Sequence, residues 1–408
     1  MVTDRFDVAI VGAGAAGIAA GRRLAALGRS VLLVEALHRL GGRAHTSQLA
    51  GIPLDLGCGW LHSAERNPLA ALADTAGIQI DRSKAAWGEQ MRDVGTSAGT
   101  QHQAWAAYEA FGARLRRDPP ASDRAGDVMS AGDPWRSFVD ALSGFMNGAE
   151  IDQLSVADFL AYDDAASGTN WRLPEGYGAF IAGLGAALPA SLGTRVTAIS
   201  EGNHLRLDTN RGPIEARAAI VTVSTTVLAS GVIRFDPPAD EHLHAASRLP
   251  LGLADKIFLS LPEPDAVPPE SHLLGRFDDA RTGSYYLRPF GRPVVECFLG
   301  GVLARELEAG GKDPAIAFVI DELRSLLGAD FARSLAPLAV TAWGREPTIL
   351  GSYSHAVPGS ADARAILARP VSRRLCFAGE ACSPRDFSTA HGAWQSGLAA
   401  ADQIAAAL

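Results

Sequence analysis

The beginning of the chain shows a regular pattern of apolar and polar positions. Residues 6–11 (FDVAIV) form a short apolar run, residues 15–27 carry alanine and leucine at helical spacing, and residues 30–34 (SVLLV) form a second apolar run. Continuous apolar strands that flank a helix are typical of a parallel sheet with both faces covered. The pattern therefore predicts a strand–turn–helix–strand unit.

Apolar runs farther along the chain predict strands of two sheets. Residues 219–223 (AIVTV) and 375–378 (LCFA) are expected to join the sheet of the first unit. Residues 253–261 and 294–299 predict strands of a second sheet, whereas residues 87–161 are rich in Ala, Arg, Asp and Trp at loosely helical spacing. An insert of helices and a second sheet is therefore expected to interrupt the first unit.

We predict an α/β plus α+β fold in which two discontinuous domains alternate along the chain. A Rossmann-like nucleotide-binding domain is expected to comprise residues 1–82, 171–250 and 346–408. A substrate-binding domain, made of helices and a mixed sheet, is expected to comprise residues 83–170 and 251–345.

The composition is that of a globular protein. Of 408 residues, 47% are hydrophobic and 20% charged, which is enough apolar material for several cores. The net charge of -8 argues against a nucleic-acid-binding surface and mildly favours a cationic ligand. The segment MVTDRFD lacks the features of a signal peptide, and no stretch reaches the ~20 apolar residues of a membrane span. We therefore expect a cytoplasmic protein that does not bind membranes.

The cysteines do not have the spacing of a metal or disulfide framework. Cys58, Cys297, Cys376 and Cys382 never form a Cys-x-x-Cys pair, which is the usual unit of zinc and dithiol sites. We therefore expect reduced thiols and no metal site.

Gly12, Gly14 and Gly17 match the glycine spacing of dinucleotide-binding turns. Because 43 residues are glycine, this spacing alone carries little weight. Its context carries more, since the turn follows a strand, opens a helix and leads after a second strand to Glu35, which can bind both ribose hydroxyls. The helix amino terminus would offer N–H groups to the pyrophosphate, and Arg43 would add a fixed cation beside it. These residues predict a dinucleotide site.

Four separated motifs carry a family resemblance. They are residues 40–44 (LGGRA), 55–62 (DLGCGWLH), 377–381 (FAGEA) and 389–397 (TAHGAWQSG), and they occur in this order along the chain. Residues 173–178 (LPEGYG) lie between them. Together these motifs resemble the flavin-containing amine oxidase family, and within it most closely the polyamine and spermine oxidases.

The resemblance implies an FAD that lies across both domains, with its flavin edge facing a substrate cavity. Contacts with the pyrophosphate, the adenosine ribose, the adenine and the ribitol side are expected from Gly12, Gly14, Ala16, Gly17, Glu35, Arg43, Val196 and Glu380. Gly59 and Trp60 are expected near the isoalloxazine. The helix that begins near Ala390 would direct its amino terminus at the flavin, where negative charge develops on reduction.

The resemblance also implies substrate-facing residues. Lys256, in an apolar strand where a lysine is costly without a partner, matches the family lysine that holds a water at flavin N5. Tyr353 would keep one wall of the family's aromatic cage, and Thr389 replaces the other wall. His62 matches a cavity histidine of polyamine oxidases. Ser352 stands where monoamine oxidases link their flavin through cysteine, so a non-covalent FAD is expected.

The implied reaction is oxidation of a C–N bond. A hydride passes from the amine α-carbon to flavin N5, the imine is hydrolysed, and O2 is reduced to hydrogen peroxide. A polyamine or another primary or secondary amine is the expected substrate of a monomer or homodimer. Acids of the insert that could bind distal ammonium groups are Glu89, Glu109, Asp163 and Asp164.

Three alternatives remain open at this point. An L-amino-acid oxidase would need a cavity arginine for the substrate carboxylate, with Arg281 and Arg288 as candidates. A dehydrogenase or desaturase of the same fold would act on a hydrophobic substrate. A flavin-binding scaffold protein would catalyse nothing. His391, in the fourth motif, is expected to be structural.

Overall fold

The expected strand–helix–strand unit is present in the computed structural model, which describes residues 6–91 and 93–408. β1 (Phe6–Val11) leads into α1 (Ala15–Ala26) and then into β2 (Val31–Val34), which pairs with β1 in parallel. The expectation that no signal peptide precedes this unit falls partly on residues 1–5, which lie outside the described residues.

The first sheet has eight strands drawn from distant parts of the chain. Its order is β11-β8-β9-β10-β1-β2-β7, and β17 pairs with β10. The two downstream strands that we predicted are confirmed, because β10 (Ile214–Val221) and β17 (Leu375–Phe377) both run parallel to β1 or to each other. The remaining strands are β7 (Ala190–Ser191), β8 (Val196–Glu201), β9 (Leu205–Thr209) and β11 (Arg234–Asp236).

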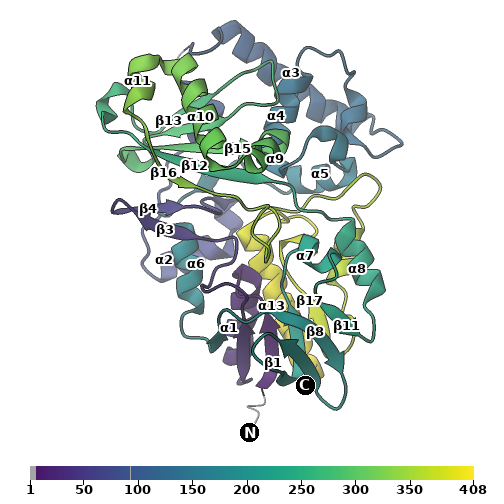
Figure 1. Cartoon of the computed structure of the whole chain (residues 1–408). Coiled ribbons are helices and arrows are strands. Elements are labelled where there is room, and N and C mark those ends of the chain that lie inside the picture. Colours follow the sequence, from purple (N-terminus) through teal and green to yellow (C-terminus); the bar gives the residue numbers. More distant parts are fainter. Residues whose placement is uncertain (1–5, 92) are drawn as a thin grey trace.

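The last helix, α13 (Ala390–Ala407), packs closely against α1. A Cβ atom at Gly397 would lie 2.1 Å from the carbonyl oxygen of Ala16, so only glycine permits this approach. Figure 1 shows the consequence: the purple start and the yellow end of the chain lie side by side in the lower half of the molecule.

The second sheet is antiparallel throughout, in the order β13-β14-β15-β12-β16. Its strands are β12 (Ala254–Ser260), β13 (Ser271–Leu274), β14 (Ser284–Leu287), β15 (Val294–Gly300) and β16 (Ala336–Val340). Helices α9 (Gly301–Gly310) and α10 (Lys312–Leu327) contribute apolar side chains to the core on one face of this sheet. This face is therefore closed to solvent.

The predicted helical stretch between residues 87 and 161 forms three main helices, namely α3 (Ala98–Arg117), α4 (Arg136–Asn147) and α5 (Val156–Asp163). They pack on each other through aromatic side chains such as Phe111 and Phe138, which are almost fully buried. Figure 1 shows these helices beside the second sheet in the upper half of the molecule.

Short elements complete the described structure. They are β3 (Thr46–Leu49), β4 (Ile52–Asp55), β5 (Leu61–His62), β6 (Asn170–Trp171), α2 (Pro68–Thr75), α6 (Tyr177–Gly185), α7 (Thr225–Ala229), α8 (Asp240–Ser247), α11 (Ala329–Ser334) and α12 (Ala363–Ala368). The β3–β4 hairpin lies between the two sheets in Figure 1. Within the described residues, no helix is both long enough and apolar enough to cross a membrane.

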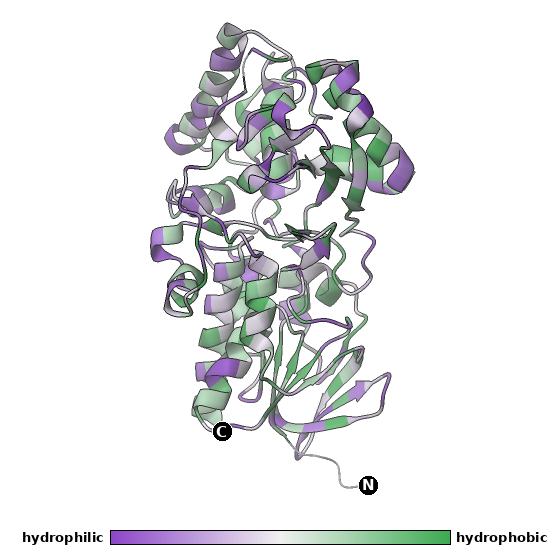
Figure 2. Cartoon of the chain, turned by 90° about the vertical axis from the view of Figure 1, so that its left-hand side faces the viewer, coloured by the Kyte–Doolittle hydropathy of each residue, from purple (hydrophilic) through white to green (hydrophobic). Residues whose placement is uncertain are grey.

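The fold class predicted from the sequence is confirmed: a Rossmann-like mixed sheet is joined to a separate sheet with its own helices. The expectation that the second sheet is mixed was wrong, because all of its strand pairs are antiparallel. In Figure 2 the strands of the lower sheet are predominantly green, whereas the helices around them carry purple, hydrophilic stretches. The exact domain boundaries proposed above remain a prediction.

Candidate active site

A cavity of about 910 Å³ extends from the carboxyl end of β1 to the second sheet. One end is lined by Val11, Gly12 and Glu35, and the other by Lys256 and Phe298. Ligand sites of doubly wound sheets lie at the carboxyl ends of the strands, which is where this cavity begins. The cavity thus connects the predicted nucleotide site with the predicted substrate region.

Glycine packing creates the first end of the cavity. Gly12 has a φ of +103°, and a Cβ atom on it would lie 2.5 Å from Thr222 Oγ1. A Cβ on Gly17 would lie 2.0 Å from the carbonyl oxygen of Gly12, so α1 can approach β1 only because residue 17 is glycine. Gly14 precedes the first turn of α1, whose N–H groups lack acceptors within the helix. This turn is suited to bind an anion.

Glu35 follows β2 and is 6% exposed. Its Oε2 accepts a hydrogen bond from the Ala13 N–H at 2.6 Å, and its Oε1 accepts one from the Leu37 N–H at 2.8 Å. Burial raises the pKa of Glu35, and these hydrogen bonds oppose that shift. The carboxylate is thus fixed beside the glycine turn and keeps lone pairs for a ribose.

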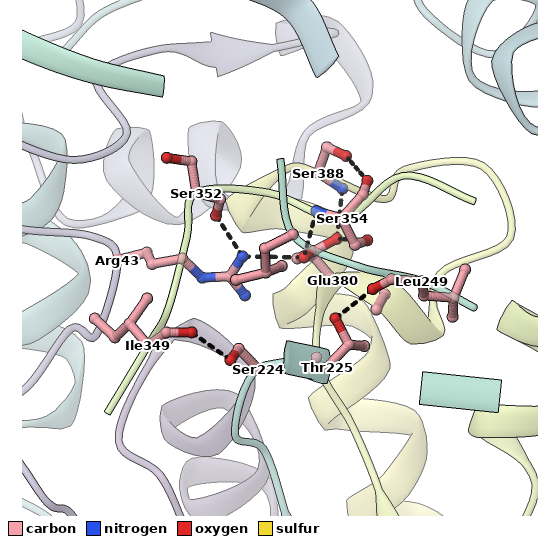
Figure 3. Close-up of polar contacts among 12 residues, drawn as sticks. Arg43, Ser224, Thr225, Leu249, Ile349, Ser352, Ser354, Glu380 and Ser388 are labelled. Atoms are coloured by element: carbon pink, nitrogen blue, oxygen red, sulfur yellow. Dashed lines mark hydrogen bonds and ion pairs between the residues drawn. The ribbon is translucent and has the colours of Figure 1, made fainter. Parts of the chain in front are cut away.

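Arg43 and Glu380 form an ion pair at the middle of the cavity, with Nη1 3.0 Å from Oε1. Figure 3 shows Arg43 also donating to the carbonyl oxygen of Ser352, at 2.5 Å. Glu380 accepts further hydrogen bonds from Ser354 and from the Ser388 N–H. Burial alone would raise the pKa of Glu380, but Arg43, Arg364 and these hydrogen bonds hold it below its ordinary value. Glu380 is therefore anchored as a carboxylate.

A second, deeper ion pair lies behind Glu380. Arg364 is 2% exposed and binds Asp158 through both Nε and Nη2, at 2.5 and 2.8 Å. It also donates to Ser354 Oγ, which in turn donates to Glu380. The guanidinium stacks on the ring of Phe387, 3.5 Å from its centroid. The motifs did not reveal this support, because residues 158 and 364 are 206 positions apart in the chain.

The second sheet presents two rows of side chains to the cavity. One row runs across the strands through Phe258, Glu296, Tyr286 and His272, and the next through Lys256, Phe298, Ser284 and Leu274. The alternate residues on the same strands, such as Ile257 and Cys297, belong to the core beneath α9 and α10. Strand periodicity thus separates a core face from a cavity face. The sequence interpretation identified Lys256 in these rows and missed Glu296, Tyr286 and His272.

Lys256 is 6% exposed and has two acceptors. Its Nζ donates to the Asp55 carbonyl oxygen at 2.9 Å and lies 2.8 Å from Glu296 Oε1. The partner that a lysine in an apolar strand requires is therefore a glutamate on the neighbouring strand β15. The predicted position of Lys256 at the cavity agrees with the structure, while its role remains a prediction.

Trp60 lines the cavity, as does Gly59. The Trp60 ring contacts Trp87 and carries the Arg172 guanidinium 4.8 Å from its centroid. Arg172 is 5% exposed and also pairs with Asp81 and Glu270. Arg172, which the sequence interpretation missed, thus fixes the orientation of this aromatic wall.

His62 and His272 both line the cavity. The Nδ1 atom of His62 lies 2.8 Å from Asn170 Oδ1, and His272 Nε2 lies 2.8 Å from Ser284 Oγ. Burial lowers the pKa of each imidazole to about 4. Both histidines are therefore neutral near pH 7 and add no positive charge to the cavity.

Tyr353 and Thr389 line the cavity too, but both hydroxyls are engaged. The Tyr353 hydroxyl donates to the Phe145 carbonyl oxygen. Thr389 caps α13, because its Oγ1 accepts from the Gly392 N–H at 3.0 Å and donates to the Asp386 carbonyl oxygen. Tyr353 can still offer its ring face, whereas Thr389 serves the helix whose amino terminus reaches the cavity at Ala390.

Other predicted residues separate into two groups. Ala16 and Val196 line the cavity, whereas Gly17 acts one layer behind it, against Gly12. His391 is 2% exposed and lies 3.2 Å from Asp386, and its structural role remains a prediction.

The charged candidates for substrate recognition lie mostly elsewhere. Arg281 pairs with Glu306 on the surface, and Arg288 donates to the Val267 carbonyl oxygen outside the described cavity lining. Arg172 and Arg292 line the cavity instead. Of the four suggested acids, Asp163 lines the cavity, where Arg116 pairs with it.

The arrangement fits a flavin dinucleotide. The glycine turn leaves space that a Cβ atom would close, the first turn of α1 offers N–H groups, and Glu35 and Glu380 are fixed carboxylates along the same cavity. The Ser352 hydroxyl donates to the Ala254 carbonyl oxygen at 2.6 Å and accepts from the Ala254 N–H, and the absence of a covalent flavin link remains a prediction.

Two family models match the chain. The model for flavin containing amine oxidoreductases covers residues 80–405, and the model for an NAD(P)-binding Rossmann-like domain covers residues 10–76. Among solved structures, a putrescine oxidase variant from a redesign of cofactor binding superposes with a TM-score of 0.78 at 20% identity, covering 98% of this chain and 99% of that chain. The latter similarity shows the shared fold.

Curated relatives match over nearly the whole chain. Polyamine oxidase 4 of Oryza sativa subsp. japonica is 28% identical and Polyamine oxidase 2 of Arabidopsis thaliana is 28% identical, covering 97% and 98% of this chain and 88% of each relative. Lysine-specific histone demethylase 1 homolog 3 of Oryza sativa subsp. indica is 29% identical over 98% of this chain and 54% of its own length. The chain belongs to the family of flavin-containing amine oxidoreductases, a family of enzymes that carry a flavin.

Proposed function

We propose that this protein is an FAD-dependent amine oxidase that binds its cofactor without a covalent link. The enzyme oxidises a C–N bond of a primary or secondary amine, and polyamines are the first candidate substrates. The observation that carries the proposal is the continuity of the cavity, which leads from the glycine turn at Gly12 to the row that contains Lys256. Cofactor and substrate can therefore meet in one continuous cavity.

Bound FAD would supply the redox chemistry, that is, acceptance of a hydride from the amine α-carbon and transfer of the electrons to O2, so that the products would be hydrogen peroxide and an imine that water hydrolyses. The protein's own residues orient the amine and limit its contact with water. Trp60, Tyr286, Phe298 and Tyr353 supply aromatic faces for the substrate. Lys256 holds an N–H donor at the cavity surface. The neutral His62 and His272 allow a cationic amine to enter without repulsion.

Asp163 supports a substrate with a second ammonium group. It lies at the cavity on α5 and is 45% exposed, and Arg116 occupies it in the described structure. A polyamine's distal ammonium would compete with Arg116 for this carboxylate. The affinity for a dication is therefore expected to exceed that for a monoamine of equal length only modestly.

A carboxylate-bearing amine is the second candidate, because Arg172 and Arg292 line the cavity near the second sheet. Arg172 already pairs with Asp81 and Glu270, whereas Arg292 donates to the carbonyl oxygens of Pro53 and Pro174. A substrate carboxylate would add a charged partner for Arg292. If the protein is an amino-acid oxidase, Arg292 is therefore a better candidate for the carboxylate-binding arginine than Arg281 or Arg288, which the sequence suggested.

A substrate panel tests both candidates. Purified holoenzyme is mixed anaerobically with spermine, spermidine, putrescine, benzylamine or L-amino acids, and bleaching of the flavin absorption is followed before air is admitted and peroxide is measured. Bleaching by the polyamines supports the proposal, and bleaching by amino acids alone supports the second candidate. If FAD is bound and none of these compounds bleaches it, the proposed activity is wrong.

A further inference from the structure

Two residues in adjacent rows of the second sheet form an ion pair that faces the cavity. Lys256 on β12 and Glu296 on β15 are diagonal neighbours, because Lys256 is opposite Phe298 and Glu296 is opposite Phe258. The Nζ and Oε1 atoms lie 2.8 Å apart, and the side chains are 8% and 23% exposed. Both line the cavity.

We propose that Glu296 is the counter-ion and positioning residue of Lys256, and that it keeps the net charge of this cavity wall near zero. This inference rests on the proposed function, since it assigns a task to Glu296 at the same site. The reasoning begins with the geometry of an ammonium group, which has three N–H donors.

The ammonium group has two fixed partners. The backbone carbonyl oxygen of Asp55 accepts a hydrogen bond at 2.9 Å, and Glu296 is the ion-pair partner, with its Oε1 2.8 Å from Nζ. Among the described residues no other acceptor for Lys256 Nζ is found, so one N–H remains for a group inside the cavity. The carbonyl of Asp55 cannot be changed by a side-chain substitution, whereas Glu296 can. Glu296 is therefore the replaceable element that sets the direction of the third N–H.

Charge balance gives Glu296 its second task. A lysine that is 6% exposed would place a positive charge in the cavity that water screens less than it screens a surface charge. The substrate amine reaches the cavity as a cation, and a lone ammonium there would repel it. The carboxylate of Glu296 cancels this charge at short range. The pair can thus donate a hydrogen bond without excluding a cationic substrate.

The charge balance predicts opposite effects of two single substitutions on the midpoint potential of bound FAD. Reduced flavin carries additional negative charge, so a net positive wall stabilises it and a net negative wall destabilises it. Glu296→Gln leaves Lys256 unpaired and should shift the potential to more positive values. Lys256→Met leaves Glu296 unpaired and should shift it to more negative values. The double variant should return toward the wild type.

Glu306→Gln is the matched control, because Glu306 pairs with Arg281 on the surface and is 48% exposed. It should leave the potential unchanged. Glu296→Asp keeps the charge and should restore most of the wild-type potential, which a merely structural defect would not do. A potential that is unchanged in Glu296→Gln, or shifts of the same sign in both single variants, would contradict the proposal.

A second readout does not depend on the flavin. The sequence contains three lysines, Lys84, Lys256 and Lys312, so acetylation by acetic anhydride can be followed at each by mass spectrometry. Glu296→Gln should accelerate acetylation of Lys256 several-fold relative to Lys84 and Lys312, because the carboxylate that lies 2.8 Å from Nζ and holds it in place is gone. Equal rates in wild type and Glu296→Gln would contradict the pairing. If no amine reduces the flavin, the proposed function fails while this comparison still tests the pair.

Discussion

Arg364 on α12 and Asp158 on α5 form a two-point ion pair, with 2% and 5% of their side chains exposed. The pair connects the helical insert with the segment that carries Glu380, through Ser354. Helices that are far apart in sequence thereby support one carboxylate of the candidate cofactor site.

Arg364→Met is expected to lower the free energy of unfolding by about 3–5 kcal/mol, because Asp158 would be left as an unpaired buried charge. Denaturant unfolding monitored by fluorescence measures this. Arg369→Met is the control: Arg369 pairs with Glu241 at the surface, where both side chains are more than half exposed, and its loss should cost about 1 kcal/mol or less. If both variants lose the same free energy of unfolding, burial of the Arg364–Asp158 pair does not increase its contribution to stability.

Glu380→Gln is expected to weaken FAD retention and to make the loss of protein stability at low pH less steep. The folded-state pKa of Glu380 lies below its ordinary value, so its stabilising contribution is fully present above about 4.5 and is lost as the pH falls through the lower folded value. Melting temperatures of the apoprotein between pH 3 and pH 7 should therefore decline less steeply in the variant. If the melting temperature of the variant falls at low pH as steeply as that of the wild type, Glu380 does not cause this decline.

Lys256→Met is expected to retain FAD but to slow flavin reduction or reoxidation by about a hundredfold, since the N–H donor at the cavity wall is lost. Stopped-flow absorbance separates the two half-reactions. Lys84→Met provides the control, because Lys84 pairs with Glu89 on the surface. Unchanged rates in both half-reactions of Lys256→Met would exclude Lys256 from the mechanism.

Glu308→Gln is expected to make the melting temperature less dependent on pH between pH 4.5 and pH 7. Burial and the neighbouring Asp255 raise the pKa of Glu308 to about 7. A raised pKa means that the stabilising contribution is fully present below the ordinary value of 4.5 and is lost as the pH rises through about 7. Wild-type melting temperatures should therefore contain a decline across this window that the variant lacks, and Glu306→Gln should retain the decline.

Gly17→Ala is expected to abolish FAD retention, since its methyl group would meet the Gly12 carbonyl oxygen at 2.0 Å. Gly183→Ala is the matched control on helix α6, where no atom lies within 4 Å of the added methyl group. Absorbance of bound flavin after desalting measures retention. Normal retention in Gly17→Ala would mean that α1 can move away from β1 without harm to the site.

The local parts of the molecule were predictable from the sequence. Nearby residues determine the strands around residues 6–11 and 30–34 and the helix between them. The glycine turn can be recognised from the spacing of its glycines. The strand that contains Lys256 was also predicted, because apolar residues flank Asp255 and Lys256 on both sides. Local periodicity therefore sufficed for the elements and for the glycine turn.

The long-range partners were not predictable from a single sequence. Glu296 reaches Lys256 only through the register of β12 with β15, and Arg364 reaches Asp158 only when α12 meets α5. Arg281 and Arg288 were candidates by residue type alone, and the fold places other arginines at the cavity. Alternation along residues 294–299 would have given the one available signal, since it puts Glu296 and Phe298 on one face.

The close packing of α13 on α1 has a consequence for the order of events during biosynthesis. Glu380, Thr389 and Ala390 line the same cavity as Gly12 and Glu35, and β17 joins β10 only after residue 375 has been made. A ribosome-bound chain therefore lacks one wall of the cofactor cavity until residues 375–408 emerge. Stable capture of the cofactor has to follow translation of that segment, and chains truncated before residue 375 should leave the ribosome as colourless protein.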